Sequence, residues 1–504
     1  MVKDKDKKVD KNQSVIMNKY CPLFDVNSYY IYHQHLNETS NNTELNSWTS
    51  LLLSLALLVS PVERVEALPQ GGSVADGGAS IEQVDDKRLE IHQETQRVIL
   101  DWSSFNIGAN ESVRFYQPSS SAVALNRIFD QNPSQIFGTL EANGQIFLIN
   151  PSGFIFGAGS QVNVNSLFVS TLDISNSDFM KGSLHFSEAI DGRNGVIIND
   201  GVIRAAAGGF VGMVASSVEN RGKIIADYGE VHLGAGTAAT VDFNGDKLLS
   251  FQVDGKILKN ATGVKAAVSN TGTIQAKSGK IVMTAKVAAD VFTQVVNNEG
   301  LIDATRVERR GGEIYLMGSG GATVNKGTIK ASTAVQDDNA GTVKITGDTV
   351  TVTGDVKAES ITGVGGNITL ESQNLTEVKE AAKVSVDSEK SSAGTIHMFG
   401  DKVGLFDNAI ASATGAVGGG EILVGGDYQG QGHYKTASFT YQGPDTQIKA
   451  NATEVGDGGK VILWSELATR AYGAIEAKGG VFSGYGCLAE VSGKQYLDMQ
   501  ASVD

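Results

Sequence analysis

Short runs of alternating apolar residues, each opened by glycine, recur along the chain. They read GGFVGMVA, GEVHLGAG, GKIVMTA, GGEIYLMG, GTVKITG, GGNITLES, GTIHMFG, GGEILVGG and GGKVILWS. Alternation with a period of two residues predicts β-strands that bury one face. A second phrase, Asn-x-Gly-x-Ile, predicts a turn followed by a short strand. This phrase begins at Asn199, Asn220, Asn270, Asn298 and Asn325.

The spacing of the strand phrases predicts a repeat architecture. Most phrases begin 20 to 40 residues apart, and one interval, from Gly229 to Gly279, is 50 residues and is interpreted as two units with a weaker one between. Units of this size, built from short strands and glycine turns, are typical of a parallel β-solenoid. Coils stacked about 4.8 Å apart close a continuous core that one coil cannot form. The repeated asparagines are expected to pair from coil to coil.

An antiparallel sandwich or barrel is the competing architecture. It needs two-residue turns between paired strands, and Asn244-Gly245 and Asp254-Gly255 provide such signals. Proline cannot donate to a strand ladder, and after Ser152 only Pro444 occurs. We therefore expect an all-β parallel solenoid. About 435 residues at roughly 23 per coil predict about 19 coils.

The stretch GQIFLINPSGFIFGAG, residues 144 to 159, combines two apolar runs with a proline. Ile146 to Ile149 and Phe154 to Phe156 are expected to form strands. Asn150-Pro151-Ser152-Gly153 suits a type I turn, with asparagine first, proline second because its φ is pre-set, and glycine fourth. The stretch therefore predicts strand, tight turn, strand.

Charge and cysteine content exclude several classes of function. The net charge is −15, with 41 Lys and Arg against 56 Asp and Glu, so the surface repels nucleic acid and anionic membranes. The two cysteines, Cys21 and Cys487, lie at opposite ends of the chain and exclude a disulfide framework or a cysteine metal site. No metal and no cofactor are expected.

The first 67 residues differ from the rest and are interpreted as a leader with a signal peptide. Thr49 to Val59 is apolar but short for a bilayer span, and Val65-Glu66-Ala67 places small residues at the −3 and −1 positions of a cleavage site near Ala67. The alternatives are a buried apolar segment or a start at Met17. Once the signal is removed, no integral membrane span is expected.

Sequence motifs for enzymes are largely absent. The Gly-x-Ser-x-Gly, His-Glu-x-x-His, P-loop and EF-hand patterns do not occur. His232 and His397 lie inside alternating strands and are interpreted as solvent-facing rather than as ligands. Carboxylates could still converge along one face of a solenoid, as in glycan-cleaving β-helices. The candidates are Asp242, Asp246 and Asp254, or Asp427 and Asp457.

Residues 102 to 170 carry a specific series of motifs. In order they are Phe105-Asn106-Ile107, Gln117-Pro118-Ser119-Ser120-Ser121-Ala122, Leu125-Asn126-Arg127, Asn132-Pro133-Ser134 and Asn150-Pro151-Ser152-Gly153-Phe154. This stretch resembles the N-terminal secretion domain of the filamentous haemagglutinin family, the exported partners of two-partner secretion systems in Gram-negative bacteria. The family's Asn-Pro-Asn-Leu motif is not found as such. The end of the chain, from Gly458, is similar to repeat blocks of haemagglutinin-like exoproteins.

The resemblance implies a right-handed parallel β-helix, export through an outer-membrane transporter partner, and a secreted or cell-surface location. We expect three segments: a leader (1–67), a secretion domain (68–254) and β-helix repeats (255–504). The resemblance also implies a transporter-recognition surface. Its expected residues are Asn132, Pro133, Ser134, Asn150, Pro151, Ser152, Gly153 and Phe154.

The preferred hypothesis is an adhesin-like exoprotein without a catalytic site, with a host or bacterial surface receptor as a further partner. One alternative is a β-helical carbohydrate-active enzyme, which converging carboxylates on one face would favour. Another is a truncated remnant that is exported but binds nothing, because the chain ends at Asp504 directly after a repeat block. The turn at Asn150 is then either a structural corner or a recognition signal.

Overall fold

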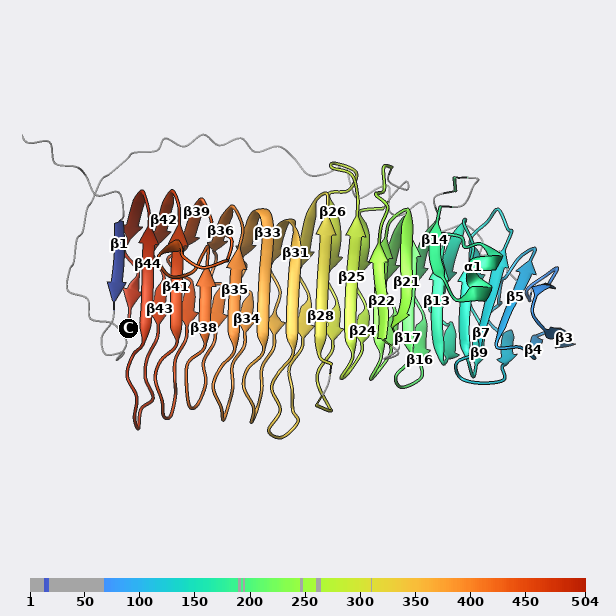
Figure 1. Cartoon of the computed structure of the whole chain (residues 1–504), viewed down its shortest axis with the longest axis horizontal. Helices are drawn as coiled ribbons and strands as arrows, with labels where there is room; N and C mark the ends of the chain where they lie inside the picture. Colours follow the sequence, from blue (N-terminus) through green and yellow to red (C-terminus); the bar gives the residue numbers. More distant parts are fainter. Residues whose placement is uncertain are drawn as a thin grey trace, which may run out of the picture.

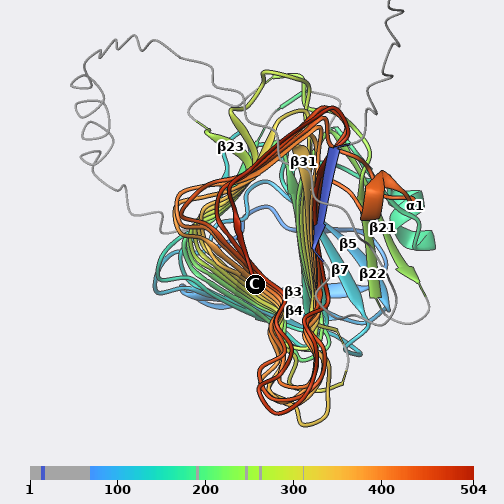
Figure 2. The same cartoon turned by 90° about the vertical axis from the view of Figure 1, so that its left-hand side faces the viewer.

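The computed structural model is an elongated solenoid whose strands stack side by side along one axis (Figure 1). Seen along that axis, three strand-bearing sides enclose one interior (Figure 2). The predicted leader, apart from residues 13–17, and Asp246 lie outside the described residues. The structure describes residues 13–17, 68–188, 192–193, 195–244, 248–259, 264–309 and 311–504.

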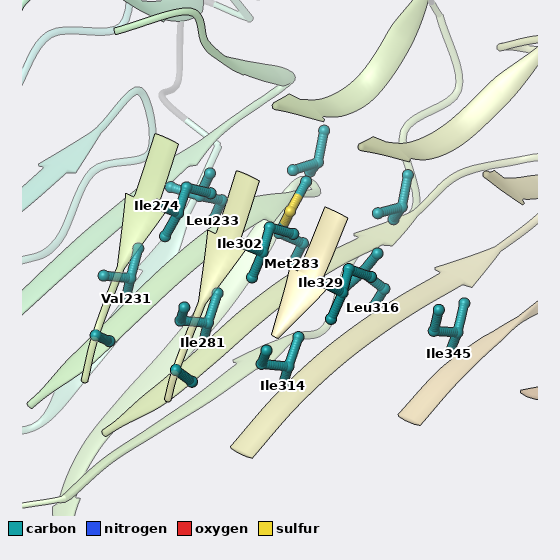
Figure 3. Packing of buried hydrophobic residues seen from close by; sticks show 14 of the residues in the cluster. Val231, Leu233, Ile274, Ile281, Met283, Ile302, Ile314, Leu316, Ile329 and Ile345 are labelled. Atoms are coloured by element: carbon teal, nitrogen blue, oxygen red, sulfur yellow. The ribbon is translucent and has the colours of Figure 1, made fainter. Parts of the chain in front are cut away.

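The first side contains strands that pair in parallel with their counterparts one coil away. Inward residues of these strands form columns, such as Val231, Ile281 and Ile314, all fully buried (Figure 3). The strands are β5 (Arg97–Trp102), β7 (Val123–Ile128), β10 (Gln145–Ile149), β13 (Ser166–Ser170), β17 (Phe210–Ala215), β20 (Glu230–Ala235), β25 (Lys280–Lys286), β28 (Glu313–Ser319), the first parts of β31 (Thr342–Val352) and β33 (Asn367–Val378), β35 (Thr395–Phe399), β38 (Glu421–Val424), β41 (Lys460–Ser465) and β44 (Leu488–Gly493).

The second side follows the first around each coil. Because β31 and β33 run through both sides without a break, the two sides form one 27-stranded sheet. The strands of the second side are β8 (Ser134–Ile136), β11 (Gly153–Phe156), β15 (Val196–Asn199), β18 (Ser217–Asn220), β23 (Ala266–Asn270), β26 (Gln294–Asn298), β29 (Ala322–Asn325), the second parts of β31 and β33, β36 (Lys402–Leu405), β39 (Phe439–Gln442), β42 (Ala468–Ala471) and β45 (Tyr496–Met499).

The third side is a 16-stranded sheet. Its first strand is β3 (Ala79–Asp85), an antiparallel partner of β4, so the other 15 strands mark 15 coils in the described part of the chain. Those strands are β4 (Arg88–Gln93), β6 (Ser112–Tyr116), β9 (Thr139–Ala142), β12 (Gln161–Val164), β16 (Val202–Ala205), β19 (Lys223–Ile225), β24 (Thr273–Gln275), β27 (Leu301–Asp303), β30 (Thr328–Lys330), β32 (Val356–Lys357), β34 (Lys383–Ser385), β37 (Ile410–Ser412), β40 (Gln447–Lys449), β43 (Ala474–Glu476) and β46 (Ser502–Val503).

These three sides define a right-handed parallel β-helix, so the predicted fold is confirmed. The expectation of about 19 coils is too high. Long segments leave the coil path and form structure outside it. That expectation counted the residues of these segments as part of the coils, so it gave too many coils.

The repeated asparagines form an internal ladder, as predicted. The side-chain amide of each of the first four donates to the side-chain oxygen of the asparagine in the next coil, at 2.7–2.8 Å. All five are completely buried, so each link satisfies polar groups that water cannot reach. The ladder consists of Asn199, Asn220, Asn270, Asn298 and Asn325.

Beyond Asn325 the same column continues with different side chains. Asn325 is in register with Val352, Val352 with Val378, and Val378 with Leu405. The column is therefore polar over residues 199–325 and apolar from Val352 to Leu405. Buried Gln442 comes next in register, and Ala471 and Met499 follow it. The predicted domain boundary at 254/255 stays a prediction, and this change in the interior occurs later in the chain.

One segment explains the 50-residue interval between Gly229 and Gly279. Strand β20 pairs directly with β25, so this interval contains a single coil, and its interpretation as two units is wrong. The additional residues form the antiparallel pair β21 (Ala238–Asn244) and β22 (Leu248–Val253), which leaves the solenoid. With β14 (Leu184–Ser187) this pair makes a three-stranded sheet. We call this sheet and helix α1 (Asn176–Lys181) the outer cap.

The outer cap covers a second hydrophobic core on the outside of the first side. Phe147 and Phe168 pack there with ring centroids 5.1 Å apart, and Phe179 of α1 and Phe186 of β14 pack onto them. Helix α1 begins at its N-cap Ser175, whose hydroxyl accepts the amide of Asp178. Aromatic residues thus face outward without being exposed to water.

The ends of the solenoid are covered by antiparallel strands. At the N-terminal end, β2 (Ser73–Asp76) pairs with β5, and the hairpin β3–β4 closes the third side. At the other end, β1 (Gln13–Met17), which belongs to the predicted leader, runs antiparallel to β44. Antiparallel pairing at the edges blocks the continuous parallel addition of another strand.

A second outer element lies near the C-terminal end. Residues 425–438, which include the 3-10 helix η1 (Tyr428–Gly430), cross the outside of β35, β38 and β41, and we call them the outer strap. Tyr434 stacks on Phe399 with ring centroids 5.1 Å apart. Lys435 donates to the carbonyls of Ser372 and Gln373, both at 2.9 Å. The strap therefore covers a smaller apolar cluster than the outer cap does.

Candidate functional site

The two Asn-Pro segments of the predicted recognition surface meet at one corner of the solenoid. The side-chain amide of Asn150 donates to the carbonyl of Asn132 at 3.1 Å and to the hydroxyl of Ser134 at 3.0 Å. Strands β8 and β11, which follow the two segments, pair in parallel with Phe154 opposite Ser134. Residues 16 to 18 positions apart in sequence thus form one structural unit, which we call the Asn-Pro corner (residues 130–134 and 150–154).

The turn at Asn150 has the predicted hydrogen bonding. The amide of Gly153 donates to the carbonyl of Asn150 at 2.9 Å, which closes a β-turn, and the amide of Ser152 donates to the Asn150 side chain at 2.9 Å. Gly153 has φ = +106°, and a Cβ atom there would lie 2.3 Å from the carbonyl oxygen of Val196. Glycine is therefore required both by the backbone conformation and by the next coil.

Most of the corner is buried in the folded chain, so only part of the predicted recognition surface is accessible. Asn150, Pro151, Gly153 and Phe154 are buried, and so is Ser134. Asn132 is exposed, while Pro133 and Ser152 are partly exposed. The neighbouring Phe129, which sequence reasoning missed, is 55% exposed. In the folded state the accessible part of the corner is therefore centred on residues 129–133.

Arg193 closes the outside of the corner. Its guanidinium donates to the carbonyl of Asp130 at 2.6 Å and to the hydroxyl of Ser152 at 2.7 Å. The amide of Gly195 donates to the carbonyl of Pro151 at 3.2 Å. Residues from the following coil therefore hold the turn in place only after that coil has formed.

The Leu125-Asn126-Arg127 motif divides its side chains between three environments. Leu125 packs under the outer cap. Asn126 lies in the interior, where it accepts the indole N–H of Trp102 at 3.0 Å. Arg127 binds Asp173 at 3.0 Å and donates to the carbonyl of Ile174 at 2.6 Å, which fixes the start of the cap. The three side chains therefore have structural roles, in the core under the outer cap, in the interior of the solenoid and at the start of the cap.

A groove with a volume of about 530 Å³ lies on the outside of the third side. One row of its lining residues comes two positions after the ends of successive strands: Thr305, Ser332, Glu359, Asp387 and Thr414. The backbone ladder continues through this row, for example from the amide of Ser360 to the carbonyl of Asp387 at 3.0 Å. Loops that project at the bottom of Figures 1 and 2 follow the same strands.

Two carboxylates of the groove belong to one polar network. The hydroxyl of Ser385 donates to Glu359 at 2.6 Å and to Asp387 at 2.8 Å. Lys383 lies between the same two carboxylates, at 3.3 Å and 3.2 Å. Proximity to Asp387 and Glu359 raises the pKa of Lys383 against the opposing effect of burial. Sequence spacing gave no signal for this pair, since residues 28 positions apart become neighbours only when coils stack.

Three of the carboxylates proposed from sequence are engaged locally. Asp254 accepts the hydroxyl of Thr240 at 2.9 Å, Asp427 pairs with Lys460 at 2.5 Å, and Asp457 accepts the amide of Tyr485 at 2.9 Å. Asp242 lies in β21 of the outer cap. These contacts assign the described aspartates to separate local roles.

The interpretation of His232 and His397 as solvent-facing is wrong. His232 is 1% exposed and pairs with the carboxylate of Glu230. Burial lowers the pKa of His232, although Glu230 acts in the opposite direction. His397 pairs with Glu421 at 2.9 Å and contacts the Tyr434 ring of the outer strap. Both residues point outward from the coil, but neighbouring residues cover them.

Within the described part of the chain, no three His, Cys, Asp or Glu side chains gather closely enough to hold a metal ion. Cys487 lies in that part of the chain as a partly buried thiol. Among the helices that the structure describes, none has the length and apolar character needed to cross a bilayer.

The three parallel sides and the antiparallel closure at the N-terminal end place the chain in the class of parallel β-helical proteins. The family model of the TPS secretion domain matches residues 65–331, more than half of the chain. The chain therefore belongs to this family, the exoproteins of two-partner secretion. A TPS secretion domain implies a protein exported from a Gram-negative bacterium through an outer-membrane transporter partner.

The chain is similar to curated relatives over about half of its length. It is 34% identical over 291 residues to a heme/hemopexin-binding protein of Haemophilus influenzae, an alignment that covers 56% of this chain and 31% of the relative. It is 25% identical over 289 residues to a hemolysin of Serratia marcescens, covering 53% of this chain and 17% of that protein. The matched region is thus less than a third of either relative.

Two solved structures are also similar. The secretion domain of HMW1 from Haemophilus influenzae aligns with 86% of this chain and 98% of its own length, at 24% identity and a TM-score of 0.47. The filamentous hemagglutinin secretion domain aligns with 73% of this chain and all of its own length, at 12% identity and a TM-score of 0.33.

Proposed function

We propose that this chain is an adhesin-like exoprotein that a dedicated outer-membrane transporter brings to the cell surface or the medium, where it binds a surface receptor without catalysis. The match of the TPS secretion domain to residues 65–331 carries the proposal. The name of the Haemophilus relative, a heme/hemopexin-binding protein, supports a binding rather than a catalytic role. We also propose that residues 1–67 act as the export leader.

We further propose that the transporter recognises the Asn-Pro corner before the following coil has closed. Asn150 and Pro151 are buried in the folded chain, and Arg193 and Gly195 cover the turn from the next coil. In a partly coiled chain these residues are still accessible. Recognition at that stage explains how buried residues can serve as a signal.

Replacement of Asn150 by alanine tests this recognition. The change removes three hydrogen bonds, two donated by the side-chain amide and one accepted from the amide of Ser152, and should lower the free energy of unfolding by about 1–3 kcal/mol. Asn220→Ala is the matched control, because Asn220 is equally buried and donates to Asn270 within the ladder. Both the secreted fraction, with the transporter co-expressed, and the urea midpoint of the purified chain are measured.

We expect Asn150→Ala to reduce secretion far more than Asn220→Ala at a comparable loss of stability. If secretion follows the urea midpoint in the same way for both variants, the corner has only a structural role. Phe129→Ser is the complementary variant, since Phe129 is exposed in the folded corner. Recognition of the incomplete coil leaves its secretion close to normal, whereas recognition of the folded surface lowers it.

A further inference from the structure

The groove on the third side lies mostly beyond residue 331, where the match to the secretion domain ends. Its lining begins at Thr305 and continues to Thr453, through six successive coils. Five intervals of about 4.8 Å give a groove roughly 24 Å long. A site of this shape suits an extended chain more than a compact small molecule.

The chemistry of the lining restricts the kind of chain. Among the described residues that line the groove, hydroxyl and carboxylate side chains predominate and aromatic rings are absent. Three carboxylates line the groove, those of Glu359, Asp387 and Glu389. The positive charge of Lys383, which pairs with the first two, does not balance their negative charge. A nucleic acid or a sulfated polysaccharide would be repelled by this surface. Ile361 is the one long aliphatic side chain among the described lining residues, and without aromatic rings beside it the groove is poorly suited to a lipid.

A peptide strand is disfavoured by the backbone. Strand addition requires free N–H and C=O groups along an edge. In the groove, these groups pair between coils: the amide of Thr333 donates to the carbonyl of Glu359 at 2.9 Å, and the amide of Ser388 to the carbonyl of Thr414 at 2.9 Å. The groove runs across the strands, so it presents side chains and no strand edge.

The remaining hydrogen-bonding groups suit a ligand that carries many hydroxyls. Hydroxyl side chains both donate and accept, and carboxylates accept. Both described contacts of the Glu359 carboxylate, from Ser385 and Lys383, are made to Oε1, which leaves Oε2 able to accept from a ligand. The network holds the carboxylate in place beforehand, so little ordering is needed on binding.

We propose that this groove binds an uncharged, linear glycan chain, with one sugar unit for roughly each coil. The proposal deepens the binding role proposed above and names the class of receptor. Because the groove offers hydrogen bonds and no aromatic platform, we expect a dissociation constant of about 0.1–1 mM for a single hexasaccharide. Repetition of the protein on a cell surface would strengthen such contacts.

The test uses the full chain and three neutral probes, cellohexaose, maltohexaose and the fully N-acetylated chitohexaose, with a heparin-derived hexasaccharide as the charged probe. Binding is measured by isothermal titration calorimetry up to about 10 mM ligand. At least one neutral hexasaccharide should bind more tightly than the heparin fragment. Failure of all three neutral probes, or binding of the heparin fragment alone, overturns the proposal.

Two substitutions locate the binding. Ala334→Trp places a large side chain on the exposed wall of the groove and should weaken binding at least about tenfold. Lys330→Trp, four residues earlier and outside the groove lining, is its control and should have no effect. Equal weakening by both, or by neither, contradicts a site in the groove.

The second pair tests the carboxylate. Glu359→Gln should weaken binding about three- to tenfold, since an uncharged acceptor forms a weaker hydrogen bond. Glu476→Gln is the matched control, because Glu476 also accepts a side-chain hydrogen bond, from Asn451 at 2.7 Å, outside the groove lining. Identical affinities for the two variants exclude Glu359 from the site. Secretion is scored separately, so an exported chain that binds no glycan overturns only this inference.

Discussion

The N-terminal and C-terminal halves of the solenoid share one continuous interior but differ in how it is built and covered. The hydrophobic core extends from Leu68 to Val491. In the N-terminal half an asparagine ladder fills one column, and the outer cap buries an aromatic cluster. In the C-terminal half the same column is largely apolar, and a groove lies outside. Both halves therefore have the same solenoid, and they differ in the side chains of this column, in the outer cap and in the groove.

The difference has a physical logic. Buried polar ladders specify register, because a slipped coil leaves amides without partners. Apolar columns tolerate more exchange of side chains. The half that matches the secretion domain thus has the more strictly specified interior, while the half with the groove has a more permissive one.

The largest effect is expected at the aromatic cluster under the outer cap. Phe147 is fully buried and contacts the rings of Phe168, Phe179 and Phe210. Phe147→Ala should lower the free energy of unfolding by about 3–5 kcal/mol. Phe399→Ala, under the outer strap, should cost less because a single strap can close onto the cavity. Urea unfolding of the purified variants measures both, and a larger loss for Phe399→Ala would reverse the comparison.

The second prediction concerns the internal column. Asn270→Leu places in the ladder a leucine of the kind that the same column has at Leu405. The substitution leaves the side-chain amide of Asn220 and the side-chain oxygen of Asn298 without their ladder partners. We expect a loss of about 2–4 kcal/mol, because each unpaired buried group costs about 1–3 kcal/mol. Leu405→Met, in the apolar part of the same column, should cost less than about 1.5 kcal/mol. Equal losses in urea unfolding would show that the two halves are equally permissive.

The smallest effect depends on pH and belongs to the C-terminal half. Glu490 lies under the outer strap, where it accepts the amide of Gln429 at 3.1 Å, and burial raises the pKa of its carboxyl. The folded state therefore binds this proton more tightly than the unfolded state, so stability rises as the pH falls toward the ordinary carboxyl range. Glu490→Gln should melt a few degrees higher at about pH 8, and its advantage should shrink toward about pH 4.

Thermal melts of both proteins across that pH range provide the measurement. A constant difference between wild type and Glu490→Gln would mean that the carboxyl does not titrate with folding. The outer cap offers a contrast, since aromatic and aliphatic contacts hold it and no comparable dependence on pH is expected there.

Much of the fold could be predicted from the sequence because the repeat is local. Alternation marked strands such as β10 and β11, the scarcity of proline supported the ladder, and the spacing of asparagines predicted their pairing. The 50-residue interval was misread because β21 and β22 show the same alternation as coil strands. Pattern alone does not say whether a strand joins the solenoid or folds over its outside.

The candidate sites were less accessible to sequence reasoning. The meeting of Asn132 and Asn150 depends on a register between neighbouring coils, and the burial of the turn depends on Arg193 and Gly195 from the coil that follows. The groove arises where residues such as Glu359 and Asp387, 28 positions apart, become neighbours. Such contacts follow from the exact length of each coil, which a variable repeat does not reveal.

The glycine that follows each ladder asparagine has a consequence for how such a gene can change in length. A Cβ atom on Gly300 or Gly327 would lie 2.1 Å from the carbonyl oxygen of the glycine one coil earlier. A duplication of one whole coil reproduces this close contact between glycines of neighbouring coils. An insertion shorter than a coil breaks the contact unless the added residues leave the coil path entirely. The hairpin of β21 and β22 shows the second outcome. We therefore expect changes of length in this molecule to be confined to whole coils and to excursions, and the excursions are where new surfaces can arise.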